Sequence, residues 1–64
     1  MEVSKLRPGM RILEDHSAGT VASMPYKMDG ADCVKVIYDG DKYAIEIFES
    51  HPGALKIEVI PNDL

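Results

Sequence analysis

The amino-acid sequence predicts an all-β protein built as one small barrel of five strands. Glycine and proline residues recur about every ten positions along the 64-residue chain, which is typical of a small sandwich or barrel. The segments between them are short and rich in β-branched side chains, and several alternate apolar with polar residues. No segment shows a sustained helical period. We therefore expect residues 1–64 to form a single domain.

The five expected strands are separated by residues that favour turns. They cover residues 10–13, 19–24, 33–38, 43–48 and 55–59. Pro8-Gly9 is expected to turn the chain before the first strand, because proline fixes φ and glycine accepts the corner conformation. Residues 14–18 are polar or small and predict a loop, while Pro25 weakens the end of the second strand. Residues 28–32 contain an Asp-Gly pair and predict a further turn.

The central hairpin is the strongest local signal in the sequence. Two β-rich runs, residues 33–38 and 43–48, are joined by Asp39–Lys42, and an Asp-Gly pair is a common hairpin turn. Alternation along a strand places every second side chain on the core face. The side chains expected to point inward are Val34, Val36, Tyr38, Tyr43, Ile45 and Ile47.

The end of the chain predicts one more strand. His51-Pro52-Gly53 is interpreted as a turn, and the strand that follows alternates apolar and charged residues. Its side chains expected to point inward are Leu55, Ile57 and Val59. Residues 61–64 are expected to form one turn of 3₁₀ helix.

Charge and composition argue against several classes of function. Seven Lys and Arg residues against eleven Asp and Glu residues give a formal net charge of −4, whereas a nucleic-acid-binding face is normally basic. Lys5, Arg7 and Arg11 form only a local basic cluster, and weak nucleic-acid binding through them is a further alternative. No apolar run approaches the ~20 residues of a membrane span, and residues 1–5 lack the apolar core of a signal peptide. With a single thiol, we expect a cytoplasmic protein without membrane contact.

Residues with reactive or metal-binding side chains are few and scattered. Cys33 is the only cysteine, so an intrachain disulfide is excluded, and we interpret it as a small hydrophobic side chain. His16 lies beside Glu14 and Asp15, but no fourth ligand follows in a metal-binding pattern. No phosphate loop or nucleophile motif is present. We expect no cofactor, no metal and no catalytic residue, and therefore a protein that is not an enzyme.

The order of the predicted elements resembles that of the SH3-like and Tudor-like barrels. A Pro-Gly turn stands before the first strand, Gly19-Thr20-Val21 opens the second, and Val34–Gly40 carries alternating apolar residues into an Asp-Gly turn. The similarity covers most of the chain. It implies an SH3-like five-stranded barrel; an OB-type barrel, which usually needs a longer chain, is the second alternative.

A second resemblance is to the trimethoprim-resistant type II dihydrofolate reductases, which are also small SH3-like barrels. Gly9–Ile12, Tyr43–Glu46 and His51–Ile57 are similar to segments of that family. The resemblance implies four barrels in a ring around a pore that binds folate and NADPH, with Lys56 and Ile57 at pore positions. The chain departs from the family's Gln-Ile-Tyr motif, because it has Lys56-Ile57-Glu58 there.

The remaining feature is a set of apolar residues that the alternation places outside the core. It consists of Ile37, Phe48 and Ile60, extended by Tyr26, Met24 and Met28. A contiguous exposed apolar patch indicates a partner surface, whereas a strongly twisted barrel can bury some of these side chains under loops. We expect a non-enzymatic interaction module that self-associates or binds a protein partner; the alternative is an oligomeric pore-type reductase or ligand-binding barrel.

Overall fold

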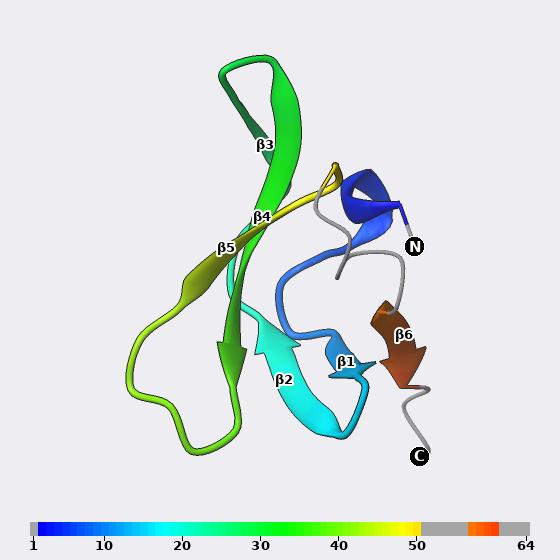
Figure 1. Cartoon of the computed structure of the whole chain (residues 1–64), viewed down its shortest axis with the longest axis vertical. Coiled ribbons are helices and arrows are strands. Elements are labelled where there is room, and N and C mark those ends of the chain that lie inside the picture. Colours follow the sequence, from blue (N-terminus) through cyan, green and yellow to red (C-terminus); the bar gives the residue numbers. More distant parts are fainter. Residues whose placement is uncertain (1, 51–56, 61–64) are drawn as a thin grey trace.

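Six short strands form one antiparallel sheet in the computed structural model, which describes residues 2–50 and 57–60. The elements are the 3₁₀ helix η1 (Val3–Lys5) and the strands β1 (Arg11–Glu14), β2 (Ser17–Val21), β3 (Tyr26–Met28), β4 (Ala31–Tyr38), β5 (Ile45–Phe48) and β6 (Ile57–Ile60). Figure 1 shows their arrangement. The all-β prediction is confirmed.

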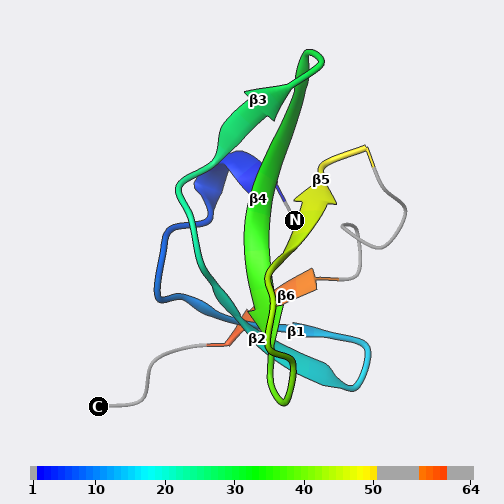
Figure 2. The same ribbon diagram turned by 90° about the vertical axis from the view of Figure 1, so that its left-hand side faces the viewer.

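Strand β4 is the centre of the sheet. The strand order is β3-β4-β2-β1-β6, and β5 pairs with β4 as well. Because β2 pairs with residues 36–38 of β4 and β3 pairs with residues 31–33, both strands occupy the same edge of β4, one after the other. Strand β5 takes the opposite edge. Figure 2 shows β4 running along the length of the molecule with these strands beside it.

Six strands therefore fill five positions. The expected strand over residues 19–24 is wrong in its bounds, because β2 ends at Val21 and β3 begins at Tyr26. Pro25 lies in the gap and has no N–H to donate to a neighbouring strand, which explains a break at this point. Among residues 2–50 and 57–60, β5 and β6 lie at the two ends of the strand order without pairing, so the sheet is open.

The expected loop over residues 14–18 is also wrong. Only Asp15 and His16 form the turn between β1 and β2, and Ser17 and Ala18 belong to β2. Asp15 has φ of 53°, a left-handed conformation that aspartate tolerates better than most residues. A two-residue hairpin turn thus replaces the loop. The expected turns at Pro8-Gly9 and within residues 28–32 are confirmed.

The core lies on one face of the sheet, which we call the inner face. Its buried side chains are Val3, Leu6, Ile12, Val21, Val34, Val36, Ile47 and Ile57. The expected inward positions of Val34, Val36, Ile47 and Ile57 are confirmed, and Tyr38 and Val59 pack against this cluster while partly exposed. Leu55 and residues 61–64 lie outside the described residues.

Two inward predictions on the central hairpin are wrong. The exposed fractions are 81% for Tyr43 and 49% for Ile45. Tyr43 precedes β5, which begins at Ile45, so its side chain is not held by the β4 ladder. Ile45 is opposite Val36 at the last position of the β4–β5 pairing. Alternation alone assumed a strand two residues longer than the one that forms.

The chain before β1 supplies two core residues that the alternation did not indicate. Val3 and Leu6 are both fully buried, and η1 packs against β4. The N–H of Leu6 donates to the carbonyl of Val3 at 3.0 Å, which closes the helical turn and brings both side chains to the sheet. A three-residue helix is too short to produce a periodic sequence pattern.

A matched pair of isoleucine substitutions tests this core. Ile12 is fully buried, whereas Ile37 is 37% exposed on the other face. We expect Ile12→Ala to lower the free energy of unfolding by about 2–5 kcal/mol, because it removes buried contacts and leaves a cavity. Ile37→Ala should change it by less than about 1 kcal/mol. Equal losses in urea denaturation would contradict the assignment of the core face.

Candidate interaction surface

The outer face of the sheet carries the apolar residues singled out from the sequence, but the strand register divides them. Ile60 is opposite Arg11, Arg11 is opposite Thr20, and Thr20 is opposite Ile37. Residues directly opposite one another share a face. Ile37 and Ile60 therefore stand at the two ends of one row across β6, β1, β2 and β4, with polar side chains between them.

Phe48 belongs to a different row. It is opposite Cys33, and Cys33 is opposite Tyr26 on the other edge of β4. Lys35 and Glu46 form the row between this one and the row of Ile37. Two residues along a strand span about 7 Å, so Phe48 and Ile37 are separated by two such steps and by a charged pair. The set of Ile37, Phe48 and Ile60 is thus not one contiguous patch.

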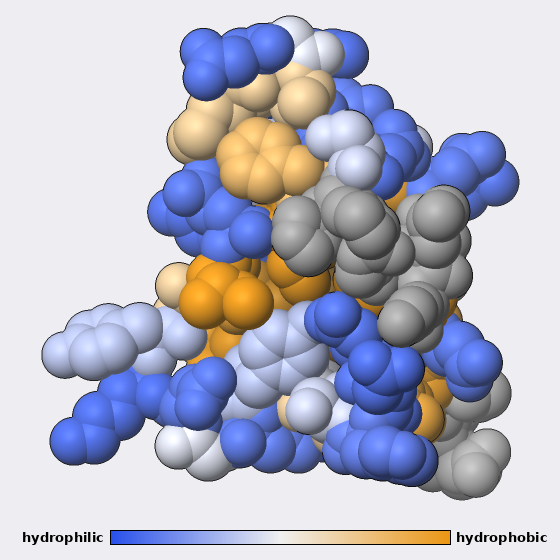
Figure 3. Space-filling model, viewed as in Figure 1, coloured by the Kyte–Doolittle hydropathy of each residue, from blue (hydrophilic) through white to orange (hydrophobic). Residues whose placement is uncertain are grey.

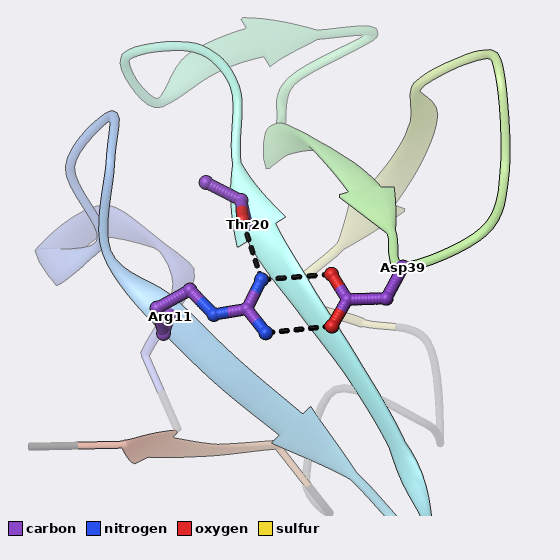
Figure 4. A network of polar contacts seen from close by, with 3 residues as sticks. All are labelled: Arg11, Thr20 and Asp39. Carbon is purple, nitrogen blue, oxygen red and sulfur yellow. Dashed lines mark hydrogen bonds and ion pairs between the residues drawn. The ribbon is translucent and has the colours of Figure 1, made fainter.

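The centre of the Ile37–Ile60 row is an ion pair, shown in Figure 4. The Arg11 guanidinium donates to both carboxylate oxygens of Asp39, over 2.8 and 2.6 Å, and its Nη1 also donates to the Thr20 hydroxyl over 2.7 Å. The hydrogen bonds from Arg11 hold the pKa of Asp39 below its usual value. The pair connects β1 and β2 to the turn after β4, and it places charge between the two isoleucines.

The row of Phe48 is more apolar. Cys33 is fully buried between its neighbours and lies outside the main core cluster. Phe48 and Tyr26 are half-buried, and Met28, two residues beyond Tyr26 on the same face of β3, is 39% exposed. We call Tyr26, Met28 and Phe48 the hairpin-end patch. In Figure 3, hydrophobic surface gathers at this end of the sheet, below the polar tip of the β3–β4 hairpin.

A hydrogen bond across the sheet holds the hairpin-end patch in place. The Tyr26 hydroxyl donates to Glu46 Oε2 over 2.6 Å, which connects β3 to β5 over the top of β4. This hydrogen bond, assisted by desolvation, raises the pKa of the Tyr26 phenol above its usual value. The Glu46 side chain is consequently directed back over its own sheet.

A separate hollow of about 670 Å³ lies at the opposite end of the sheet. Its lining includes Glu14, Asp15, His16, Asp39 and Asp41, together with Tyr38. The Tyr38 hydroxyl donates to Glu14, and partial burial followed by this bond raises the pKa of Tyr38. Within the described part of the chain, no group of three His, Cys, Asp or Glu side chains is placed to hold a metal ion.

The three residues of the basic cluster each have an intramolecular partner. Lys5 Nζ lies 3.7 Å from Glu2 Oε2, and Arg7 Nη1 donates to the carbonyls of Ser4 and Leu6. Arg11 is held by Asp39. These cations come from η1, the following turn and β1, and the structure directs each of them to an oxygen of its own chain.

The structure describes only one of the two residues that the reductase resemblance assigns to a pore. Lys56 lies outside the described residues, while Ile57 is 4% exposed and part of the core. Pore lining by Lys56 and Ile57 therefore stays a prediction, and Ile57 has almost no surface available for it.

Sequence patterns gave little indication of the polar contacts at this surface. Arg11 and Asp39 are 28 residues apart, and Tyr26 and Glu46 are 20 apart. Only the register of four strands brings each pair together. The one available signal was the Asp-Gly turn, which fixed the place of Asp39 at the end of β4.

Comparisons with known proteins identify no relative of this chain. No protein-family model, no curated protein and no solved structure matches the chain. In the described ranges, no helix has the length and apolar character to cross a membrane.

The raised pKa values of Tyr26 and Tyr38 predict that the tyrosine phenols ionise in two steps as the pH is raised. Tyr26 and Tyr38 each donate from a neutral phenol to a carboxylate, and ionisation breaks that bond. The bond is the main cause of the raised pKa of Tyr26, whereas partial burial is the main cause for Tyr38 and the bond adds to it. The stability that these bonds contribute is present below pH ~10 and lost as pH rises through the raised values. We expect part of the phenolate absorbance to appear only well above pH 10.

Single Tyr→Phe replacements show which tyrosine gives the phenolate absorbance that appears well above pH 10. Tyr26→Phe and Tyr38→Phe should each remove about one tyrosine's share of it, measured by ultraviolet absorbance against pH. If either variant instead removed absorbance that develops near pH 10, the corresponding hydrogen bond would be absent in solution.

Proposed function

We propose that this protein is a non-enzymatic interaction module that self-associates through the hairpin-end patch. The observation that carries the proposal is the placement of Tyr26, Met28 and Phe48 together on one end of the outer face, partly exposed around the buried Cys33. Aromatic residues and methionine are enriched in protein interfaces. Contiguous apolar surface of this kind indicates a partner.

The size of the core supports a partner that is a second copy. Among residues 2–50 and 57–60, eight buried side chains form the cluster. Domains of about 64 residues usually need a disulfide, a metal or association to gain stability. A single cysteine, itself buried, forms no intrachain disulfide. Association that involves only the folded state stabilises it by mass action.

The polar side chains of the outer face support binding rather than catalysis. The Tyr26 hydroxyl is bonded to Glu46, and the Arg11 guanidinium is bonded to Asp39 and Thr20. Each of these groups is used to connect strands. The surface therefore offers shape and apolar area, which are the properties of a contact surface.

We further propose that the sheet is an SH3-like barrel left open between β5 and β6. Strands β2 and β3 share one edge of β4, so the order around the sheet is five positions, as in the expected five-stranded barrel. The last strand returns to pair with the first through the β1–β6 ladder. Only the contact between the two end strands would complete the ring.

Native molar mass tests the proposed self-association. We expect light scattering on a sizing column to give a multiple of the 7.1 kDa chain mass for the wild type. Phe48→Asp and Met28→Asp should lower the mass to that of one chain, because a charge in an apolar interface is desolvated without a partner. Met28 is exposed, so its replacement leaves the core intact.

Ile37→Asp is the matched control. Ile37 has nearly the exposure of Met28, 37% against 39%, but it lies in the other row of the outer face. We expect this variant to keep the wild-type mass. A wild type that has the mass of one chain at millimolar concentration, or a Met28→Asp variant that stays associated, would refute the proposal.

A further inference from the structure

The outer edge of β5 presents backbone groups without a partner among the described residues. In the β4–β5 ladder, the N–H of Glu49 donates to the carbonyl of Asp32 over 2.9 Å, and the register continues this pairing to Val34–Ile47 and Val36–Ile45. Antiparallel ladders alternate between pairs that exchange hydrogen bonds and pairs that do not. The N–H and C=O groups of Glu46 and Phe48 therefore point away from β4.

Within the described residues, the β5 edge lacks the features that usually protect an edge strand. Proteins guard such edges with lysine, proline, bulges or charges placed over the edge, whereas β5 reads Ile-Glu-Ile-Phe. Its one charged side chain, Glu46, is held by the Tyr26 hydroxyl on the far side of β4, so the carboxylate is drawn away from the edge. Beside it, Ile45 leaves 49% of its surface exposed.

We propose that a second copy of the chain adds to this edge, β5 against β5 in antiparallel orientation, and that the two sheets become one. The inference rests on the self-association proposed above and names its geometry. Of the hairpin-end patch, Phe48 lies on β5, whereas Tyr26 and Met28 lie on β3 on the other side of β4. The shared sheet therefore brings the second copy against the Phe48 end of the patch. The partner is a second copy because Glu46 and Phe48, the two residues of β5 whose backbone groups face outward, can pair with each other across a two-fold axis.

That register follows from the residues whose backbone groups face outward. Pairing Glu46 with Glu46 of the second copy would set like charges directly opposite, which is destabilising. Moving the strands by two residues places Glu46 opposite Phe48 of the second copy and Ile47 opposite its own equivalent on the two-fold axis. Both residues of the first pair lie on the outer face. On the inner face, the exposed Ile45 then becomes a diagonal neighbour of the second copy's Ile47.

Disulfide trapping tests the register directly. In the proposed pairing, the Cα atoms of residue 46 and residue 48 of the second copy lie about 5.5 Å apart, within disulfide reach, whereas 46 to 46 and 48 to 48 exceed the limit of about 7 Å. Cys33 lies directly opposite Phe48 in the β4–β5 ladder, so both cysteine variants also carry Cys33→Ala, which prevents a competing disulfide within one chain. We expect Glu46→Cys alone and Phe48→Cys alone to stay uncrosslinked under mild oxidation, and their mixture to give a crosslinked heterodimer.

The outcomes separate the two proposals. An associated wild type whose mixed variants form no 46–48 crosslink would overturn edge pairing while leaving self-association intact. Crosslinks within either single variant would also overturn this register. A wild type that has the mass of one chain at all concentrations would overturn the self-association itself.

A backbone substitution provides a second test without cysteines. Glu46→Pro and Glu46→Ala both remove the carboxylate bonded to Tyr26, but only proline removes the outward N–H, and proline is tolerated on an edge where that group faces away from the sheet. The proline variant would therefore lose two symmetry-related hydrogen bonds, one from the N–H of residue 46 in each copy. We expect the dissociation constant of Glu46→Pro to be about tenfold or more above that of Glu46→Ala, with unchanged circular dichroism. Equal constants would overturn the edge pairing.

Discussion

The structure depends on one eight-residue strand that is paired along both edges. Strand β4 receives β2 and β3 on one side and β5 on the other, and η1 packs against it. Its even-numbered residues Val34 and Val36 enter the core, while Cys33 is buried on the opposite face. Most strands of antiparallel sheets bury one face and expose the other. Here the middle strand has covered side chains on both faces, which makes it the element that fixes the positions of the rest.

The space around β4 is correspondingly tight. Gly19 lies opposite Tyr38 in the β2–β4 ladder, and a Cβ at this position would come within 3.0 Å of the Tyr38 ring and of a Val36 methyl group. The absence of a side chain lets the ring lie over the β2 backbone, from where its hydroxyl reaches Glu14. One glycine thus connects the core to the polar contact at the end of β1.

The sequence predicted what depends on neighbours along the chain and missed what depends on the register between strands. The hairpin of β4 and β5 followed from alternation and an Asp-Gly turn, both of which are local. Ile45 was misplaced because the end of a ladder is decided by its partner strand. Val3 and Leu6 were missed because a short helix has no period to detect.

The candidate surface illustrates the same division. Alternation correctly indicated that Ile37 and Ile60 are exposed on the outer face, but it carried no information on which of them adjoin Phe48. That required the pairing of four strands, which separates the two groups by the Lys35–Glu46 pair. The Arg11–Asp39 contact needed the same information. Sequence reasoning therefore found candidate residues but not the patch.

The break between β2 and β3 has a consequence for motion. Toward the β3–β4 turn, the last hydrogen bond between β4 and the β5 side runs from the Glu49 N–H to the Asp32 carbonyl. Beyond it, among the described residues, Ala31 pairs with Met28 of β3, so the sheet narrows to a two-stranded ribbon, and such ribbons are marginally stable in water. Segments with few buried contacts open at a lower free-energy cost than the core. The hairpin end would therefore exchange its amide hydrogens through local opening while β1 and the rest of β4 stay closed. A partner that covers Met28 would slow this exchange, and part of its binding free energy would go into ordering the ribbon.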